Sequence, residues 1–321
     1  MSIKLKKEGL HNKAHNFIAA GVTCYAISLL DDLGLLDLLI EKQALPSDIY
    51  LSYQNPLVVK KAIQTLQCNN IVYYKNKNYK LTVFGKTLMQ HRGSIGLIYN
   101  GYRNVLSNQV DIFKNSPSAI GHLIDDSAIS KAAAQMGDEF FNNKILKILQ
   151  NHSIRGKICD LGCGNGATLT HLCRMMKLPG LGIDTSPASI EIAKNQVTLN
   201  DKITFAVEDI NEICHVYTDV DVLIQSFVMH DFPNEKYKQT LQSLRKAFPN
   251  TKLFLYIDAV SPEDKDSHQL PGFDYIHSLF GTQPKTLQET IQLLTECNFR
   301  IINQEPIPEL TNCYIWTLSL K

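Results

Sequence analysis

The sequence predicts an α/β protein whose larger part is a doubly wound, mostly parallel seven-stranded sheet. Two observations predict it. From residue 156 onward, short apolar runs alternate with segments of helical periodicity, and a glycine-rich turn over 162–166 follows the first run. Strands that alternate with helices form parallel sheets covered on both faces. The chain of 321 residues exceeds one average domain, which leaves a separate unit ahead of this sheet.

Seven apolar runs predict the strands of the sheet: Lys157–Leu161, Gly180–Ile183, Ile203–Val207, Val220–Phe227, Leu253–Ile257, Arg300–Gln304 and Cys313–Leu318. Four helices are expected between them: Thr168–Met176, Pro187–Leu199, Glu235–Phe248 and Leu287–Cys297. The last two strands have no helix between them, so we expect an antiparallel hairpin at one edge. Ligands of such sheets bind beyond the carboxyl ends of the strands, which is where we expect the functional residues.

The residues ahead of the sheet predict a mainly helical unit. Apolar residues have helical spacing over 13–42, with an interruption at Gly34, and again over Leu57–Cys68. Two short strand-like pieces follow, Ile71–Tyr74 and Tyr79–Leu81. Helices followed by a small hairpin are typical of a winged helix, which either binds DNA or serves in association.

The charges of this unit favour association. Its basic residues near the hairpin and the preceding helix are few: Lys60, Lys61, Lys75, Lys77 and Lys80. Phosphate binding needs several basic contacts on one face, whereas Phe17–Ile40 is strongly apolar. We therefore expect a dimerisation domain over 1–92, a helical connector or substrate lid over 93–150, and the catalytic domain over 151–321.

Composition narrows the partners further. The formal net charge is +1, which argues against a nucleic-acid or membrane surface. Eight cysteines include no C-x-x-C pair, which indicates buried thiols in a reducing compartment. The N-terminal residues are too mixed for a signal peptide, and no apolar run reaches membrane-spanning length. We expect a cytoplasmic protein.

The glycine-rich turn indicates a nucleotide-type cofactor, because glycines let the backbone approach a ligand closely. Gly162-x-Gly164-x-x-Ala167 fits the dinucleotide fingerprint, with Asp184 at the spacing of a ribose-binding acid. The alternative is S-adenosylmethionine, in whose sites an acid precedes G-x-G-x-G. Asp160 favours the alternative, because a carboxylate there repels a pyrophosphate and suits an ammonium and a sulfonium.

Three further candidates follow the next strands. Asp184, after the second strand, can accept hydrogen bonds from ribose hydroxyls. After the third strand, Asp209 can accept from an adenine amino group while Ile210 packs on the ring. Gln225, near the end of the fourth strand, is a fourth cofactor-binding candidate.

The run Asp160-x-Gly162-x-Gly164-x-Gly166, together with Asp184 and Asp209, resembles the class I S-adenosylmethionine-dependent methyltransferases. A winged-helix domain followed by helices and this Rossmann-like sheet is similar to the small-molecule O-methyltransferases, so the resemblance covers the whole chain. It implies S-adenosylmethionine as cofactor, a small organic substrate and an interlocked homodimer.

The fourth strand is followed by His230-Asp231-Phe232. A matching His-Asp-aromatic run occurs in the O-methyltransferases, where the resemblance implies that the histidine is a general base. A neutral imidazole at His230 could take a hydroxyl proton as the oxygen attacks the methyl carbon.

A second histidine changes the expected chemistry. In Pro271–Gly281, Asp274 and His277 are spaced i, i+3 and so share a helix face. The set His230, Asp231 and His277 resembles a group that C-methylates α-keto acids and holds a metal ion with two histidines and an aspartate. Asp274 is a candidate further ligand or a hydrogen-bond acceptor behind a histidine.

The hypothesis of a bound metal ion fits the chemistry of C-methylation. An α-keto acid must lose a proton from Cβ before it accepts a methyl group, and an iron, zinc or similar ion would stabilise the enolate. Two imidazoles and a carboxylate leave coordination positions for such a ligand. Arg103 and Lys285 are candidates for orienting the substrate carboxylate. The alternatives are an O-methyltransferase with His230 as base and a regulator that only senses S-adenosylmethionine.

Overall fold

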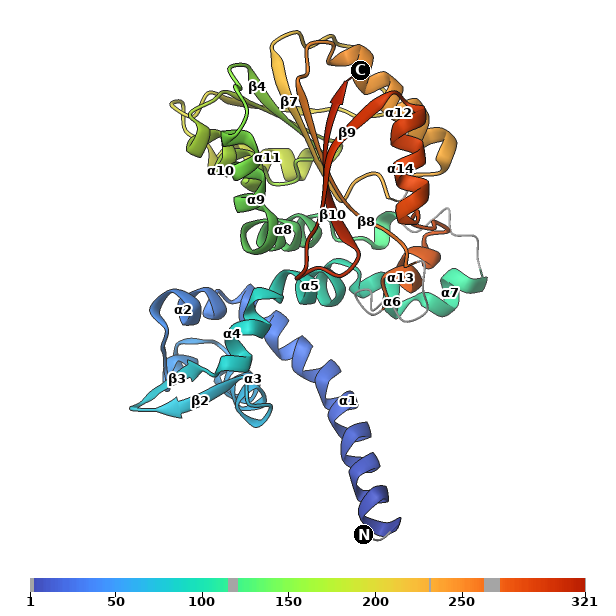
Figure 1. Cartoon of the computed structure of the whole chain (residues 1–321). Helices are drawn as coiled ribbons and strands as arrows, with labels where there is room; N and C mark the ends of the chain where they lie inside the picture. The colour runs from blue at the N-terminus through green and yellow to red at the C-terminus, as the bar shows by residue number, and fades with distance from the viewer. Residues whose placement is uncertain (1–2, 115–120, 231, 263–271, 321) are drawn as a thin grey trace. The chain divides into compact units, whose positions relative to one another are not determined.

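The computed structural model describes residues 3–114, 121–230, 232–262 and 272–320 (Figure 1). The chain divides into two compact units, residues 1–101 and residues 102–321. The expected division into 1–92, 93–150 and 151–321 stays a prediction. No described helix is both long and apolar enough to cross a membrane.

The first unit consists of helices around a small antiparallel sheet. Its helical segments are α1 (Ile3–Asp32), α2 (Leu35–Lys42), η1 (Ile49–Ser52), α3 (Pro56–Cys68), α4 (Val83–Gln90), α5 (Arg92–Gly96) and η2 (Leu97–Gly101). Strands β1 (Leu45–Pro46), β2 (Val72–Lys75) and β3 (Asn78–Leu81) form a sheet in the order β1-β3-β2. The hairpin was predicted, whereas β1 was missed because its proline indicates a turn. Gly34, with φ of 70°, separates α1 from α2.

The second unit contains the predicted seven-stranded sheet. Its strands are β4 (Lys157–Leu161), β5 (Gly180–Asp184), β6 (Ile203–Val207), β7 (Val220–Ser226), β8 (Leu253–Ala259), β9 (Phe299–Pro306) and β10 (Cys313–Leu320). The order is β6-β5-β4-β7-β8-β10-β9. The first five run parallel, and β10 pairs antiparallel with β8 and with β9. The α/β fold with an antiparallel edge hairpin is confirmed.

Four helices cover the two faces of this sheet: α10 (Ala167–Met176), α11 (Pro187–Gln196), α12 (Asn234–Ala247) and α14 (Leu287–Glu296). Figure 1 shows α10 and α11 on one side and α12 and α14 on the other. Their starts follow from the sequence. The Ser186 side chain accepts from the N–H of Ser189 with Pro187 next to it, and Thr286 and Glu289 form a capping box.

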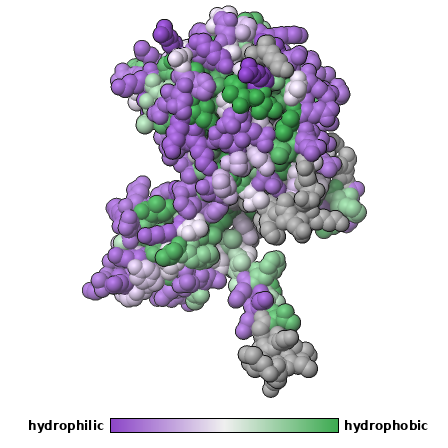
Figure 2. Space-filling model, viewed as in Figure 1, coloured by the Kyte–Doolittle hydropathy of each residue, from purple (hydrophilic) through white to green (hydrophobic). Residues whose placement is uncertain are grey.

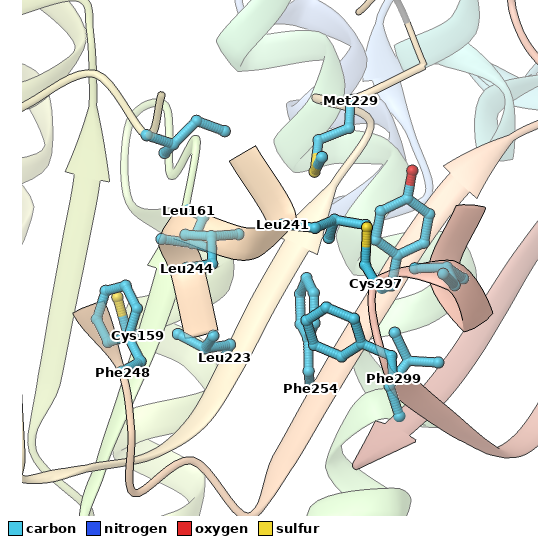
Figure 3. Close-up of a cluster of buried hydrophobic side chains, with 14 of the residues drawn as sticks. Cys159, Leu161, Leu223, Met229, Leu241, Leu244, Phe248, Phe254, Cys297 and Phe299 are labelled. Carbon is cyan, nitrogen blue, oxygen red and sulfur yellow. The ribbon is translucent and has the colours of Figure 1, made fainter. Parts of the chain in front are cut away.

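The core explains the apolar runs. Figure 3 shows side chains of the strands and of α12 interleaved beneath the sheet, among them Leu161, Leu223, Leu244, Phe254 and Phe299, all buried. Every residue of β8 is buried, which is expected of a strand covered on both faces. Five of the eight cysteines are buried and none forms a disulfide.

The described residues of the second unit contain further helical segments beside these four: α6 (Arg103–Ser107), α7 (Gln109–Lys114), η4 (Gly121–Leu123), α8 (Asp126–Met136), η5 (Gly137–Phe141), α9 (Asn142–Gln150) and α13 (Phe273–Leu279). Helix α8 starts with a side-chain cap, since the Asp125 side chain accepts from the N–H of Ala128 at 3.0 Å. Residues 95–110 fall in several short helical segments.

Candidate active site

The glycine turn joins β4 to α10 in a conformation that requires glycine. Gly162, Gly164 and Gly166 have φ of 75°, 53° and 74°, in the left-handed region. A Cβ on Gly162 would lie 2.4 Å from Val228, and a Cβ on Gly166 would lie 2.7 Å from Phe205. The left-handed backbone, and the close contacts at Gly162 and Gly166, strongly favour glycine at these positions.

Asp184 shapes this turn. One of its carboxylate oxygens accepts from the N–H of Gly164 at 2.8 Å, and the other accepts from the N–H of Ser186 at 2.8 Å. Ser186, and not Asp184, provides the side-chain cap of α11. Since a carboxylate oxygen accepts more than one hydrogen bond, Asp184 keeps acceptor capacity for a ligand beside the glycine turn.

Asp160 lies at the carboxyl-terminal part of β4 and is 4% exposed. Burial, and then the nearby carboxylate of Asp184, raise the pKa of Asp160 to about 7. Within the described part of the chain its carboxyl group makes no hydrogen bond. A buried carboxyl group without a donor is costly unless a ligand supplies one. The observation fits a cationic group bound in front of the glycine turn.

Helix α8 from the expected connector packs over the same place. Ser130 would contact a Cβ on Gly164 at 3.1 Å, and its hydroxyl lies 3.2 Å from that of Ser189 in α11. Burial, and then the charges of Asp184 and Asp125, raise the pKa of Asp126. Helix α8, which belongs to the segment predicted as a connector or substrate lid, thus packs at the glycine turn, and its role as a lid stays a prediction.

The other three cofactor candidates lie in different settings. Asp209 accepts from the backbone and side-chain N–H groups of Asn211 at 2.9 and 2.5 Å. Ile210 is buried in the core of the sheet domain. Gln225 is fully buried, and its amide oxygen accepts from the N–H of Val228 at 2.8 Å. Gln225 therefore holds the loop that leads to His230, and cofactor contact by these three residues stays a prediction.

That loop begins with a strained residue. Phe227, directly after β7, has φ of 58°, which is rare for a large side chain. Its N–H donates to the carbonyl of Ile257 at 2.9 Å, and its ring lies 5.8 Å from that of Phe141 in η5. Such strain persists only where neighbouring contacts hold it, and it turns the chain sharply toward His230.

His230 is buried beside a carboxylate that sequence reasoning missed. Its Nδ1 lies 2.7 Å from Oδ1 of Asp258, and only 8% of His230 is exposed. A carboxylate accepts, so Nδ1 carries a proton, and in the neutral imidazole Nε2 is then the acceptor nitrogen of the ring. Asp258 also accepts from the hydroxyl of Tyr256 at 2.9 Å and from the N–H of Ala259 at 3.0 Å.

His277 lies next to His230. Their ring centres are 5.0 Å apart with planes at 71°. Nδ1 of His277 lies 2.7 Å from the carbonyl oxygen of Phe273, which only accepts, so Nε2 of His277 is again the acceptor nitrogen. The ring of Phe273 lies 4.0 Å from His277 and 5.6 Å from His230. The structure thus brings the two predicted histidines together.

The remaining candidates are placed as follows. Asp231 lies outside the described residues. Asp274 accepts from the hydroxyl of Ser261 at 3.1 Å. Lys285 is buried, and its ammonium donates to the carbonyl of Phe232. Arg103 is exposed at the start of α6.

The two histidines suit a metal ion in part. Ligating histidines usually hold their second nitrogen on an oxygen acceptor, as both do here. Two imidazoles bound to one ion through Nε2 have ring centres about 5 Å apart, from metal–nitrogen distances of about 2.1 Å. Across the described ranges, no group of three or more His, Cys, Asp or Glu side chains is arranged to hold a metal. The predicted third ligand, Asp231, falls in the gap between those ranges.

Sequence reasoning missed Asp258 because β8 was predicted to end at Ile257. The strand continues to Ala259. The signal was present, since an acid at the carboxyl end of a strand next to the one that precedes His230 belongs to the ligand-binding edge.

Comparison with known proteins finds methyltransferases. Residues 158–249 match a family model described as a methyltransferase domain. Indolepyruvate C-methyltransferase of Streptomyces griseus is 28% identical over 315 residues, which cover 95% of this chain and 94% of that protein. A 2-heptyl-1-hydroxyquinolin-4(1H)-one methyltransferase of Mycobacteroides abscessus is 27% identical over 128 residues, 38% of this chain and 56% of that protein.

Solved structures share the fold along the whole chain. Human N-acetylserotonin methyltransferase, in complex with S-adenosylmethionine, has a TM-score of 0.70 and 16% identity, with 97% of both chains covered. Mitomycin 7-O-methyltransferase has a TM-score of 0.68 and 14% identity, with 99% of this chain and 100% of that chain covered.

Proposed function

Since this chain is a class I S-adenosylmethionine-dependent methyltransferase, we propose that it transfers the methyl group to Cβ of a small α-keto acid. The observation that carries the proposal is the pair of His230 and His277, whose ring centres are 5.0 Å apart. An O-methyltransferase needs one imidazole as base, so a second one held beside it supports a reaction that uses both. Similarity to an indolepyruvate C-methyltransferase over nearly both lengths supports an aromatic keto acid.

The bond changes define what the site must do. The Cβ–H bond of the keto acid breaks, its proton leaves to a base, and its electron pair forms the enolate. The enolate carbon then attacks the sulfonium methyl, so that a C–C bond forms as the C–S bond breaks and S-adenosylhomocysteine leaves. Positioning of the two reactants is the main requirement of that second step.

In this proposal His230, His277 and Asp231 would hold a metal ion. Bound there, the ion would act as a Lewis acid on the keto and carboxylate oxygens and stabilise the enolate. The chain itself fixes both imidazoles through Nδ1, on Asp258 and on the carbonyl of Phe273. Both Nε2 atoms are thereby committed to the acceptor role, whether toward a metal ion or toward a proton.

In this proposal S-adenosylmethionine binds at the edge of the sheet beside the glycine turn. We assign its ammonium to the carboxyl group of Asp160, which is buried and has no donor in the described structure. We assign its ribose hydroxyls to Asp184, which already accepts two loop N–H groups, and its adenine amino group to Asp209. These carboxylates suit a ligand that carries positive charge.

A second candidate function is O-methylation of a small hydroxylated metabolite. The contact between His230 and Asp258 favours it, because a carboxylate on Nδ1 prepares Nε2 to take a proton. In that reaction the substrate O–H gives its proton to Nε2 of His230, and the oxygen attacks the sulfonium methyl. His277 has no required part in it.

We further propose that the enzyme is a cytoplasmic homodimer that associates through a winged-helix first unit and binds no nucleic acid. Helix α1 exposes large apolar side chains, and Figure 2 shows hydrophobic residues along its surface. They are Leu10, Phe17, Ile18, Val22 and Tyr25. Several large apolar side chains exposed along one helix are typical of an interface.

The two candidate functions are distinguished by the methyl acceptor that each uses and by the effect of the His277→Ala variant. Purified protein is incubated with S-adenosylmethionine and either indolepyruvate or phenylpyruvate, or a panel of phenols, with and without a chelator. We expect a β-methylated keto acid by mass spectrometry, loss with chelator, and loss in His277→Ala. Transfer to phenols alone, undiminished in His277→Ala, would establish the second function and reject the first. Full methyl transfer to the keto acid after complete metal removal would show that the reaction needs no metal ion.

A further inference from the structure

A buried run of hydrogen-bonded hydroxyl groups leads to Asp258, the carboxylate that contacts His230. The hydroxyl of Tyr237 donates to that of Tyr256 at 2.8 Å, and the hydroxyl of Tyr256 donates to Oδ2 of Asp258 at 2.9 Å. The other oxygen of Asp258 holds Nδ1 of His230. Both tyrosines and Asp258 are at most 1% exposed. Each proton of this run points toward the carboxylate, so Asp258 acts only as acceptor.

Lys285 holds the same loop from its other end. Its side chain is almost fully buried, and the ammonium donates to the carbonyl of Phe232, two residues after His230. The N–H of Phe232 in turn donates to the carbonyl of Met229 at 3.0 Å, which closes a turn around His230. Asp258 thus holds the imidazole and Lys285 holds the backbone.

Lys285 also reaches both the tyrosine run and the helix of His277. Its ammonium lies 4.9 Å from the ring centre of Tyr237, where a cation polarises the ring and strengthens its hydroxyl as a donor. Its backbone carbonyl accepts from the N–H of Ser261 at 2.8 Å. The hydroxyl of Ser261 lies 3.1 Å from Oδ1 of Asp274, one turn before His277.

We propose that Tyr256, Tyr237 and Lys285 are positioning residues that together fix the distance and orientation between the imidazoles of His230 and His277. The inference rests on the proposed function only in taking these histidines as the reacting centre. Its basis is a continuous set of contacts from the imidazole of His230 to the helix that carries His277. Removal of one member leaves a buried acceptor unsatisfied and allows the imidazole to turn.

This role differs from the carboxylate anchor that the sequence suggests for Lys285. An anchor contributes to substrate binding, so its loss raises KM for the acceptor. A positioning residue acts on geometry that matters in the transition state, so its loss lowers kcat and leaves KM near its original value. The two roles are therefore distinguishable in steady-state kinetics.

The test compares Tyr256→Phe and Lys285→Met with matched controls, using whichever acceptor the wild type methylates. Tyr256→Phe removes one oxygen atom, and its control is Tyr314→Phe on the neighbouring strand, where Tyr314 pairs with Asp258 across β10 and β8. The control for Lys285→Met is Lys252→Met, whose ammonium pairs with Asp221 at the amino end of the sheet.

We expect Tyr256→Phe and Lys285→Met to lower kcat about 5- to 30-fold, as the loss of one buried hydrogen bond does, with KM for both substrates within about twofold. The double variant should lose no more than the worse single variant, because the residues act as one unit. The controls should keep wild-type kcat.

Two results would overturn the inference. One is wild-type kcat in Tyr256→Phe, which stays informative even if Lys285→Met fails to fold. The other is a raised acceptor KM at unchanged kcat in Lys285→Met, which would make Lys285 the carboxylate anchor. Failure of the keto-acid proposal leaves this test intact, because a hydroxyl acceptor then reports on the same imidazole.

Discussion

Oδ1 of Asp258 lies 2.7 Å from Nδ1 of His230, and both side chains are buried. The contact joins the end of β8 to the loop after β7, two neighbouring strands of the sheet. Because the carboxylate fixes the protonated nitrogen, it determines which nitrogen of His230 faces the reaction. Both candidate functions depend on that choice.

We therefore predict that Asp258→Asn lowers kcat/KM about 10- to 100-fold, since the amide can present a donor where His230 needs an acceptor. Steady-state kinetics with both acceptor classes measures the loss. Asp221→Asn is the control, because Asp221 is a buried acid at the opposite end of the sheet that accepts from Lys252 and the N–H of Gly156. It should lose stability but keep kcat/KM. Equal kcat/KM for Asp258→Asn and wild type would contradict the role of this contact.

The sequence predicted the order of elements because periodicity and glycine turns are local signals. It predicted His230 and His277 as partners only through a resemblance, and the structure brings them side by side. It could not predict that Gln225 turns to the loop N–H of Val228 or that Tyr237 reaches Tyr256. Those contacts join residues that are distant in sequence or that lie within apolar runs. A single polar side chain in an apolar run gives no periodic signal from which its partner could be predicted.

Asp160 gives a prediction about pH. Its pKa is raised to about 7 by burial and by Asp184, so the folded chain keeps a proton that the unfolded chain loses near pH 4. The unfolded state then binds fewer protons, and the free energy of unfolding falls as pH rises from about 4 to about 7. Asp160→Asn should remove this part of the slope and make the cofactor-free protein more stable at pH 8.

The same variant should bind the cofactor less tightly, because an amide does not pair with an ammonium as a carboxylate does. Thermal unfolding between pH 5 and pH 8 without cofactor measures the slope, and calorimetry with S-adenosylmethionine measures the affinity. We expect a Kd about 10-fold higher, which is about 1.4 kcal/mol. Identical slopes for wild type and Asp160→Asn would show that Asp160 does not titrate in this range.

The glycine turn gives a prediction with a matched control. Gly162→Ala places a side chain at φ of 75° and pushes on Val228, in the loop that carries His230. Gly34→Ala meets the same left-handed strain, at φ of 70°, with no atom within 4 Å. Gly34→Ala should lose about 1–2 kcal/mol of stability in denaturant unfolding from the backbone strain alone. Gly162→Ala should lose more, because its Cβ would lie 2.4 Å from Val228, and only Gly162→Ala should lose cofactor binding. Intact binding by Gly162→Ala would mean that the turn tolerates a Cβ.

The exposed surface of α1 gives a prediction about assembly. Phe17 and Ile18 are 84% and 67% exposed, although each buried apolar side chain contributes about 1.5–3 kcal/mol. If a second copy covers them, the double variant Phe17→Asp with Ile18→Asp should convert a dimer into a monomer, because burial of two unpaired carboxylates is costly. Light scattering after size exclusion gives the mass. Leu199→Asp, at a fully exposed site in the second unit, should keep the wild-type mass. A wild type that is monomeric, or a variant that stays dimeric, would place the interface elsewhere or exclude it.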